Sequence, residues 1–408
     1  MNLLRLKQLY RSVAVISLNT FIVIILINLL LALFFLIQDR QPTAELEPVK
    51  IAEDRWESLQ KVYPGLSREE IQTLYTEMRS PSRSFIYDPY TEFKERPFRG
   101  RYLTEDVNGF RHIKNQGPWP PDKEKYFTVF VFGGSTTFGF GVADDQTVAS
   151  YLQEFLSDAN LGKEVRVYNF GRESYYSTQE RILFERLITS GYKPDMAIFI
   201  NGLNDFYYYD DRPAFADNFE QLFIQKPPPL WQCLKRIPML RAVREIRRAL
   251  GLVNDSSPQK SDASITDEKT YNDQAALLNV IRRYTENKRI IDAVGKAQGI
   301  RTVAVWQPIS LYKYDLKYHL FAGDGFGRHL YAKYGYPLMA DAASQNSLGD
   351  NFLWCADMQE QATEPLYVDV THYTGNMARA FAKKIFDMMV SRNLLPGADK
   401  GLKNTSPK

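Results

Sequence analysis

A serine in a glycine-rich turn is the most suggestive candidate for chemistry in this sequence. Ser135 lies in the string Phe-Gly-Gly-Ser-Thr-Thr-Phe-Gly-Phe-Gly, residues 132–141, between a predicted strand and a predicted helix. Glycines allow a tight bend that exposes one hydroxyl at the end of a strand, and the N-terminal amides of the following helix can stabilise an oxyanion. The string predicts a nucleophile, and the alternative is an ordinary turn between strand and helix.

Two other functions of glycine-rich turns are excluded by the residues present. A Walker phosphate loop requires Gly-x-x-x-x-Gly-Lys-[Ser/Thr], and although Gly134 and Gly139 have the right spacing, Phe140 stands where the lysine is required. The dinucleotide-binding pattern Gly-x-Gly-x-x-Gly is also absent from the string. No nucleotide cofactor is therefore expected.

A serine nucleophile needs a base, and His372 is the best candidate. It follows Asp369 by three residues, a separation that brings the two side chains together in a helical turn. Asp369 can then accept a hydrogen bond from one ring nitrogen and leave the other nitrogen free for the proton of Ser135. The alternative is a structural pair that caps the last helix. The other histidines, weaker candidates because of their surroundings, are His112, His319 and His329.

Glycine and asparagine at two further strand ends could stabilise an oxyanion. Gly171 ends one predicted strand, and Asn204 follows the next. Parallel strands end at the same edge of a sheet, so the Gly171 amide and the Asn204 side chain could point into one crevice with Ser135. Each signal is weak alone, because glycine and asparagine commonly form turns.

The regular pattern from residue 127 onward predicts a parallel sheet covered by helices on both faces, because short apolar strands alternate with helices. The predicted strands are residues 127–132, 165–170, 196–200 and 302–306, and the predicted helices are residues 147–156, 179–190, 276–298 and 376–391.

Together these segments resemble the four signature blocks of the SGNH hydrolases, the GDSL esterase/lipase family. The blocks are Gly134-Ser135 with Thr137 and Gly139, then Gly171, then Gly202-x-Asn204-Asp205, and finally Asp369-x-x-His372. The resemblance implies a three-layer α/β/α sandwich, flavodoxin-like, with Ser135 as nucleophile, His372 as base and Asp369 as its orienting partner. It also implies an oxyanion hole formed by the Ser135 amide, the Gly171 amide and the Asn204 side chain.

The sequence departs from the family pattern at two places. Gly134 stands where the family usually has an acidic residue before the serine, a change also compatible with activity. Arg172 and Glu173 follow Gly171 where the family commonly has small residues, so two charges are expected near the site. They either contact the substrate or pair with each other at the rim.

The N-terminal segment predicts a membrane anchor. Residues 12–37 contain no charge, and the run exceeds the roughly 20 residues that cross a bilayer. The competing interpretation, a cleaved signal peptide, usually has a shorter apolar region that ends in small residues. Basic residues precede the run (Arg5, Lys7, Arg11), so residues 1–11 are predicted to stay in the cytoplasm and the rest to be exported.

The remaining boundaries follow from composition. Residues 38–84 are expected to form a stem that includes a helix opened by the capping box Ser67-Arg68-Glu69-Glu70. Residues 85–395 are assigned to the hydrolase domain, with insertions at 206–271 and 312–350, and residues 396–408 to a disordered tail. The basic segment 235–248 has an open role: a stripe of arginines there (Arg241, Arg244, Arg248) suits anionic lipid or polymer, or simply faces solvent.

Composition excludes several classes of function. Of 408 residues, 51 are Lys or Arg and 48 are Asp or Glu, and the net charge of +3 is too small for a nucleic-acid-binding surface. Two cysteines, Cys233 and Cys355, permit one bridge or two free thiols, and neither they nor the scattered histidines provide a zinc site. No metal and no cofactor are therefore expected, and the sequence leaves the oligomeric state open.

These features predict a membrane-anchored, extracytoplasmic serine esterase. The expected partner is an acyl-ester substrate. An anchored, exported enzyme of this kind is similar to those that act on small acyl groups of envelope or exported polysaccharide, and this resemblance implies such a substrate first and a lipid or lysophospholipid ester next. Transfer of the acyl group to a sugar hydroxyl would use the same triad. A hypothesis from another class is a catalytically silent assembly protein that binds polymer and functions without Ser135.

Overall fold

The structure is a computed structural model. It describes residues 3–38, 46, 48–80, 83, 85–159, 161–223, 237–250, 268–345 and 347–396. The chain divides into two compact units: residues 1–45 with 217–261, and residues 46–216 with 262–408. Cys233, the polar part of the first predicted insertion and all of the predicted tail except residue 396 lie outside the described residues.

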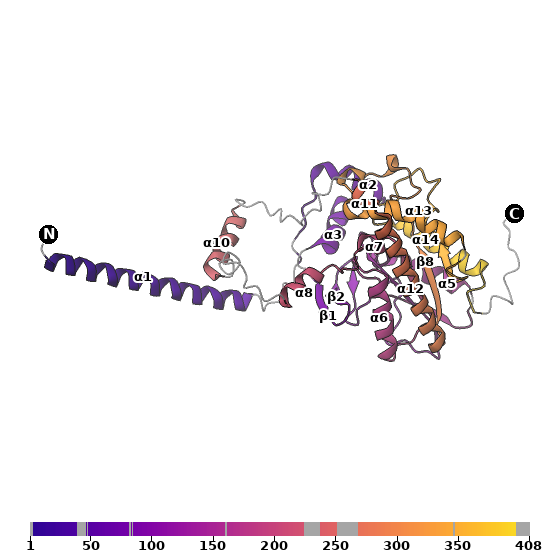
Figure 1. The fold of residues 1–408 in the computed structure, drawn as a ribbon, viewed down its shortest axis with the longest axis horizontal. Helices are drawn as coiled ribbons and strands as arrows, with labels where there is room; N and C mark the ends of the chain where they lie inside the picture. The colour runs from indigo at the N-terminus through magenta and orange to yellow at the C-terminus, as the bar shows by residue number, and fades with distance from the viewer. Residues whose placement is uncertain are drawn as a thin grey trace. The chain divides into compact units, whose positions relative to one another are not determined.

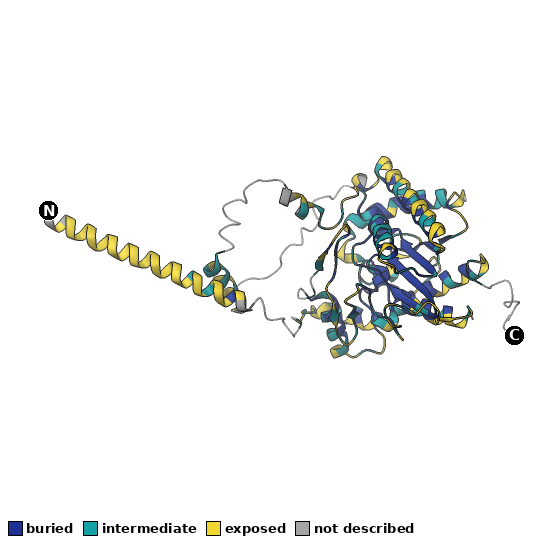
Figure 2. Cartoon of the chain, turned by 90° about the horizontal axis from the view of Figure 1, so that it is seen from below, coloured by how far each residue is buried: buried dark blue, intermediate teal, exposed yellow. Residues whose placement is uncertain are grey.

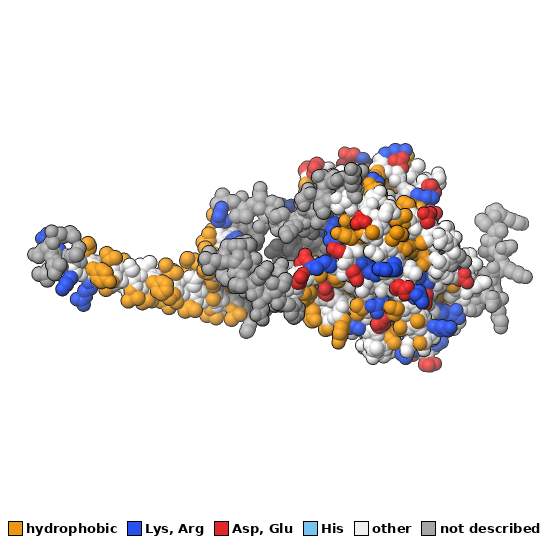
Figure 3. Space-filling view, in the orientation of Figure 1, with side chains coloured by type: hydrophobic (Ala, Val, Ile, Leu, Met, Phe, Trp, Pro, Cys, Tyr) orange, Lys and Arg blue, Asp and Glu red, His pale blue; other side chains and the backbone are white. Residues whose placement is uncertain are grey.

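The first unit contains a long apolar helix. Helix α1 (Leu3–Gln38) includes one stretch, Lys7–Leu36, that is long and apolar enough to cross a membrane. Figure 3 shows hydrophobic side chains along its surface and basic side chains near its N-terminal end. The amphipathic helix α10 (Pro238–Ala249) contacts α1: the Met239 amide donates to Asn28 Oδ1 at 3.1 Å, and the Arg241 guanidinium lies 4.0 Å from the centre of the Phe35 ring.

The second unit is built on a five-stranded parallel sheet in the order β6-β5-β7-β8-β9. Its strands are β5 (Tyr126–Gly133), β6 (Glu164–Asn169), β7 (Met196–Asn201), β8 (Arg301–Trp306) and β9 (Phe352–Trp354). The first four confirm the predicted strands. Strand β9 was not predicted, because three residues are too few to show a periodicity.

Helices cover both faces of this sheet, which confirms the predicted three-layer fold (Figure 1). They are α5 (Val148–Asp158) and α14 (Gly375–Ser391) on one face, and α6 (Ser177–Thr189) and α12 (Gln274–Gln298) on the other. Alternate residues of β5 point to opposite layers: Val129 and Val131 pack with α5 and α14, and Phe130 and Phe132 pack with α6. Strands β5 and β7 are buried along their whole length (Figure 2), and this accounts for their mostly apolar sequences.

The insertion predicted at 312–350 is ordered and helical. Short turns Leu316–Tyr318, Ala322–Asp324 and Gly327–His329 lead into α13 (Leu330–Ser344). Tyr331, Tyr336 and Met339 of α13 are buried in one apolar cluster with Leu277 and Tyr284 of α12. The other short helices are α4 (Ser135–Phe138), α7 (Leu203–Tyr207), α8 (Ala216–Phe223), α11 (Glu268–Tyr271) and the turn Asp144–Gln146.

The described residues between 48 and 121, which we call the cover, pack against the sandwich. They form the turn Glu53–Arg55, α2 (Trp56–Val62), α3 (Arg68–Arg79) and the short strands β1 (Phe85–Asp88), β2 (Glu92–Glu95), β3 (Phe98–Arg99) and β4 (Thr104–Glu105). The capping box predicted at Ser67–Glu70 is confirmed.

This packed arrangement differs from the stem that was expected over residues 38–84. Leu59 of α2 and Leu74 of α3 are buried in a cluster with Phe138, Phe140 and Val368, residues that flank the predicted nucleophile and base. Removing such side chains from water is favourable by about 2 kcal/mol each, so the helices fold onto the domain instead of projecting from it.

Candidate active site

The nucleophile turn is shaped by two glycines that allow neighbouring segments to approach. Strand β5 ends at Gly133 and α4 begins at Ser135. A Cβ atom at Gly134 would lie 2.4 Å from Asn204 Nδ2 and 2.9 Å from the Tyr175 carbonyl oxygen. The predicted glycine-rich turn is therefore required sterically, and it brings Ser135 beside the ends of the two neighbouring strands.

The structure brings Ser135, His372 and Asp369 together in one hydrogen-bonded chain. Ser135 Oγ lies 2.8 Å from His372 Nε2, across 237 residues of sequence. His372 Nδ1 lies 2.7 Å and 2.8 Å from the two carboxylate oxygens of Asp369. Asp369 fixes the ring so that Nδ1 carries its proton toward the carboxylate and Nε2 faces the serine.

Asp369 is held ionised by its neighbours. Burial alone would raise the pKa of Asp369, but the charge and hydrogen bond of His372, the Arg79 guanidinium and the Thr371 amide outweigh it and hold that pKa well below its ordinary value. Backbone amides of Thr371 and His372 donate to Oδ1 at 3.1 and 3.0 Å, and Arg79 Nη2 lies 2.5 Å from Oδ2. A carboxylate with this many donors stays ionised, and therefore a hydrogen-bond acceptor, near neutral pH.

The short helix that carries Ser135 is fixed by two buried polar side chains. Asn169, at the end of β6, donates through Nδ2 to the carbonyl oxygens of Thr137 and Phe138 at 3.0 and 3.3 Å. Arg111 of the cover is fully buried and donates to the carbonyl oxygens of Phe138, Gly139 and Val142 and to Asp144 Oδ1. They satisfy carbonyl groups that the short helix leaves without internal partners.

The predicted oxyanion donor Gly171 is placed differently from expectation. Its amide donates to Asn169 Oδ1 at 3.0 Å, and a Cβ atom there would lie 2.4 Å from the Phe138 amide nitrogen. Gly171 thus supports the nucleophile turn through a close backbone contact, and its N–H group is already engaged.

Ser174 is an alternative candidate for the backbone N–H donor that was expected at Gly171. It has φ +64°, a left-handed conformation that non-glycine residues seldom adopt, and within the part of the chain that the structure describes its amide makes no hydrogen bond. The next carbonyl, that of Tyr175, accepts a hydrogen bond from Asn204 Nδ2 at 2.8 Å. Sequence reasoning missed Ser174, because serine carries no signal for positive φ.

Asn204 lies where the sequence placed it, at the start of α7 beside Gly134. The buried carboxylate of Asp205 accepts from the amides of Gly202 and Ser177 at 3.1 and 3.3 Å and so fixes this turn against α6. Gly202 has φ +126°, a backbone conformation that favours glycine.

The charges of Arg172 and Glu173 do not pair with each other. Arg172 is buried and lies 3.2 Å from Asp88 Oδ2 and 3.0 Å from the Tyr175 hydroxyl. Glu173 forms an ion pair with Arg83 of the cover. Both charges therefore have other partners within the fold, and the predicted pairing between Arg172 and Glu173 is wrong.

The other histidines are placed outside the hydrogen-bonded triad. His319 Nε2 donates to the Val370 carbonyl oxygen at 3.1 Å, because its Nδ1 accepts from the Phe321 amide. The His329 ring lies 4.7 Å from the Tyr207 ring, and burial together with the nearby His372 lowers the pKa of His329 to about 4. His112 lies 3.1 Å from Asp106 Oδ2.

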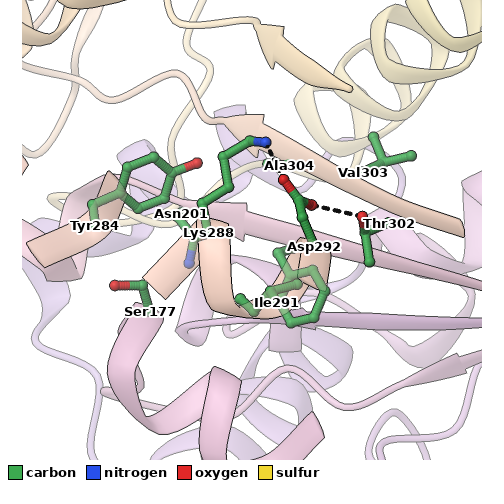
Figure 4. A pocket seen from close by; sticks show the side chains of 10 residues that line it. Ser177, Asn201, Tyr284, Lys288, Ile291, Asp292, Thr302, Val303 and Ala304 are labelled. Carbon is green, nitrogen blue, oxygen red and sulfur yellow. Dashed lines mark hydrogen bonds and ion pairs between the residues drawn. The ribbon is translucent and has the colours of Figure 1, made fainter. Parts of the chain in front are cut away.

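A separate small cavity lies between α12 and the sheet (Figure 4). It has a volume of about 10 Å³, room for one water molecule, and is lined by residues that include Ser177, Asn201, Lys288 and Asp292. Within the described residues, no cluster of three or more His, Cys, Asp or Glu side chains could hold a metal ion. Cys355 is a buried free thiol.

No family model and no curated protein sequence matches the chain. Solved structures do match, over about two thirds of it. An acetyl xylan esterase is 12% identical over 64% of this chain and 98% of its own, with a TM-score of 0.34. A lipase/acylhydrolase from Enterococcus faecalis is 14% identical over 65% and 96%, with a TM-score of 0.33.

A member of the lipolytic protein G-D-S-L family from Veillonella parvula is 10% identical over 64% of this chain and 96% of its own, with a TM-score of 0.32. These three solved structures are described as an esterase, a lipase/acylhydrolase and a lipolytic protein, and at these identities and TM-scores the descriptions hold for them and not for this chain.

Proposed function

We propose that this protein is a membrane-anchored serine esterase of the SGNH type. The observation that carries the proposal is the chain of hydrogen bonds from Ser135 Oγ through His372 to Asp369, with distances of 2.8 and 2.7 Å. A half-buried, oriented carboxylate, an imidazole and a half-buried hydroxyl in this order form the arrangement that activates serine for acyl transfer.

The reaction begins when His372 Nε2 takes the proton of Ser135 Oγ as that oxygen attacks the ester carbonyl. The negative charge on the carbonyl oxygen would be stabilised by the Ser135 amide, the Asn204 side-chain amide and the Ser174 amide, which replaces Gly171 in this role. His372 then gives its proton to the leaving alcohol. The acyl-enzyme is hydrolysed by water that His372 deprotonates, and the free acid leaves.

The anchor supports a place at the outer face of a membrane. The apolar stretch Lys7–Leu36 is preceded by basic residues, and this bias favours a cytoplasmic N-terminus with the catalytic unit exported, in a periplasmic or extracellular position. A single-pass enzyme held there meets acylated envelope or exported polysaccharide, and we propose small acyl esters on such polymers as the substrate. If a sugar hydroxyl replaced water in the second step, the enzyme would transfer the acyl group.

The test uses the full chain in detergent. The wild type is expected to form one covalent adduct with a fluorophosphonate probe and to hydrolyse p-nitrophenyl acetate. Ser135→Ala should lose the adduct and at least about 10³-fold in kcat, because the nucleophile is gone and only binding and the oxyanion donors remain.

A folded wild type with neither adduct nor turnover would contradict the proposal and favour a binding protein. Given turnover, release of acetate from acetylated polysaccharide but not of fatty acid from phospholipid vesicles would support the substrate class. The reverse result would replace it with lipid esters.

A further inference from the structure

A residue outside the four signature blocks forms an ion pair with Asp369 of the triad. Arg79, the last residue of α3, places Nη2 2.5 Å from Asp369 Oδ2, across 290 residues of sequence. The side chains of Arg79 and Asp369 are 31% and 16% exposed, so the pair is partly shielded from solvent. Because Thr371 and His372 amides donate to Oδ1, Arg79 completes the set of donors that fixes both carboxylate oxygens.

The Arg79 side chain is itself held in place by stacking. Its guanidinium carbon lies 4.8 Å from the ring centres of both Tyr75 and Phe140. The Phe140 ring in turn lies 4.7 Å from the His372 ring. Planar guanidinium groups suit such sites because they stack and form hydrogen bonds at the same time. One contact network therefore joins α3 to both members of the His-Asp pair.

Arg79 is also the permanent positive charge next to this pair in the described part of the chain. Other titratable groups lie next to Arg79 or to Asp369. They are Tyr63, Tyr75, His319 and His329. Burial raises the pKa of Tyr63, and burial lowers the pKa of His319 and His329, so these three stay neutral near pH 7. Tyr63 donates its hydroxyl proton to the Gly141 carbonyl oxygen, and Asp324 pairs with Arg55.

We propose that Arg79 is a positioning residue that holds the Asp369 carboxylate in its hydrogen bonds with His372, so that α3 of the cover completes the active site. The inference rests on the proposed serine esterase function. Arg79 acts through Asp369: its hydrogen bond stops the carboxylate from rotating, and its charge limits how strongly Asp369 favours the protonated imidazole.

Two consequences can be measured when the charge is removed in Arg79→Met. First, kcat at the optimal pH should fall about 10-fold, because a looser carboxylate orients His372 less well. Second, the acidic limb of the pH profile of kcat/KM should move to higher pH by roughly half to one unit, because protonated His372 is favoured once the neighbouring cation is gone.

The experiment compares full-chain variants in detergent with p-nitrophenyl acetate from pH 5 to 9. Arg79→Lys keeps the charge and should retain the acidic limb of the wild type. Arg68→Met is the matched control on the same helix, because Arg68 pairs with the exposed Glu53 and should change neither quantity. In an Asp369→Asn background, Arg79→Met should have no further effect on kcat, since its route of action is already lost.

A histidine NMR titration provides a readout that needs no turnover. In ¹⁵N-histidine-labelled protein, Arg79→Met should move the titration midpoint of His372 in the same direction as the kinetic limb. If turnover is absent but the midpoint moves, the proposed function fails and the positioning role stands. If the wild type turns over and neither limb nor midpoint moves, or if Arg79→Met raises KM alone, Arg79 is not a positioning residue.

Discussion

The ends of the parallel strands and the cover contribute to the candidate site in opposite ways. At the strand ends, Ser135 and Asn204 lie close together because β5 and β7, neighbours in the sheet, deliver them to one edge of it. The cover contributes no residue to the predicted blocks, yet Arg79, Arg83 and Arg111 reach Asp369, Glu173 and the nucleophile turn from it. Ser135 and Asn204 thus come from neighbouring strand ends of the sheet, whereas the three arginines reach the site from a separate region of the chain.

Because of this difference, we expect mutations in the two regions to affect different properties of the protein. A change at the strand ends removes a group that acts on the substrate and should alter kcat with little effect on stability. A change in the cover disturbs buried charge and should alter stability, or the pH dependence of either quantity.

The largest effect tests the strand ends. Asn204→Ala removes a side-chain amide that we assign to the oxyanion hole, and kcat should fall about 10² to 10³-fold. Asn204→Asp keeps the shape without the donor and should fall at least as far. Thermal unfolding of both variants should stay near that of the wild type, since the hydrogen bond lost with Tyr175 is worth only about 1 kcal/mol. A stable variant with wild-type kcat would remove Asn204 from the oxyanion hole.

An intermediate effect tests the cover through Glu95 of β2. Burial, the larger cause, and the charge of Glu173 together raise the pKa of Glu95 from 4.5 to about 7. Because the folded state retains this proton more tightly than the unfolded state, stability is lost as the pH rises from 4.5 through 7. Glu95→Gln keeps an oxygen for the Glu173 amide and should stabilise the protein by about 1–3 kcal/mol at pH 8 and by little at pH 4.5.

The measurement for Glu95→Gln is thermal unfolding of the full chain at both pH values, with the exposed Glu124→Gln as control. The esterase activity at pH 7 should change less than twofold, because Glu95 contacts no residue of the triad. A gain that is equal at both pH values would show that ionisation of Glu95 does not limit stability.

The smallest effect is expected at Ser174, where the two regions meet. Ser174→Gly relieves a left-handed residue and should stabilise the protein by less than about 1 kcal/mol, partly offset by the lost interaction with the Tyr208 hydroxyl. Activity should be retained, because the backbone N–H group stays. Ser174→Val is the contrast: a branched side chain resists positive φ, and its kcat should drop if this amide stabilises the oxyanion. Equal kcat in both variants would argue against that role.

The sandwich could be predicted from sequence because its signals are local. Each buried strand is a continuous apolar run, and each helix has its own cap or periodicity, so four strands of the central sheet and its four flanking helices were identified without knowledge of contacts. Residue type and spacing also singled out Ser135, Asp369 and His372, whose side chains lie within hydrogen-bond distance of one another in the structure. Strand β9 was not predicted because it is only three residues long, and helix α13 was not predicted because Pro337 lies in its interior.

The supports of the site could not be predicted, because their partners lie far away in the sequence. Nothing near Arg79 indicates a contact with a carboxylate 290 residues later, and α3 looks by itself like a solvated helix with a good cap. Gly171 was chosen for an oxyanion role by residue type, but the close contact with Phe138 uses its lack of a side chain instead. A glycine at a strand end does not reveal which neighbour requires it.

The buried Arg111 gives the chain a recognisable marker that does not depend on the serine. Four of its five N–H donors are directed at three carbonyl oxygens and one carboxylate oxygen in the loop after Ser135. Lysine has only three donors and no rigid fork, so it would leave acceptors of this buried loop unmatched. Where a related sequence pairs Asn-Gly-Phe-Arg with a downstream Gly-Gly-Ser turn, we expect a loop of the same length and path between its nucleophile and the following helix. Position 111 can thus serve to sort related sequences by the architecture around the serine, which the serine motif alone does not distinguish.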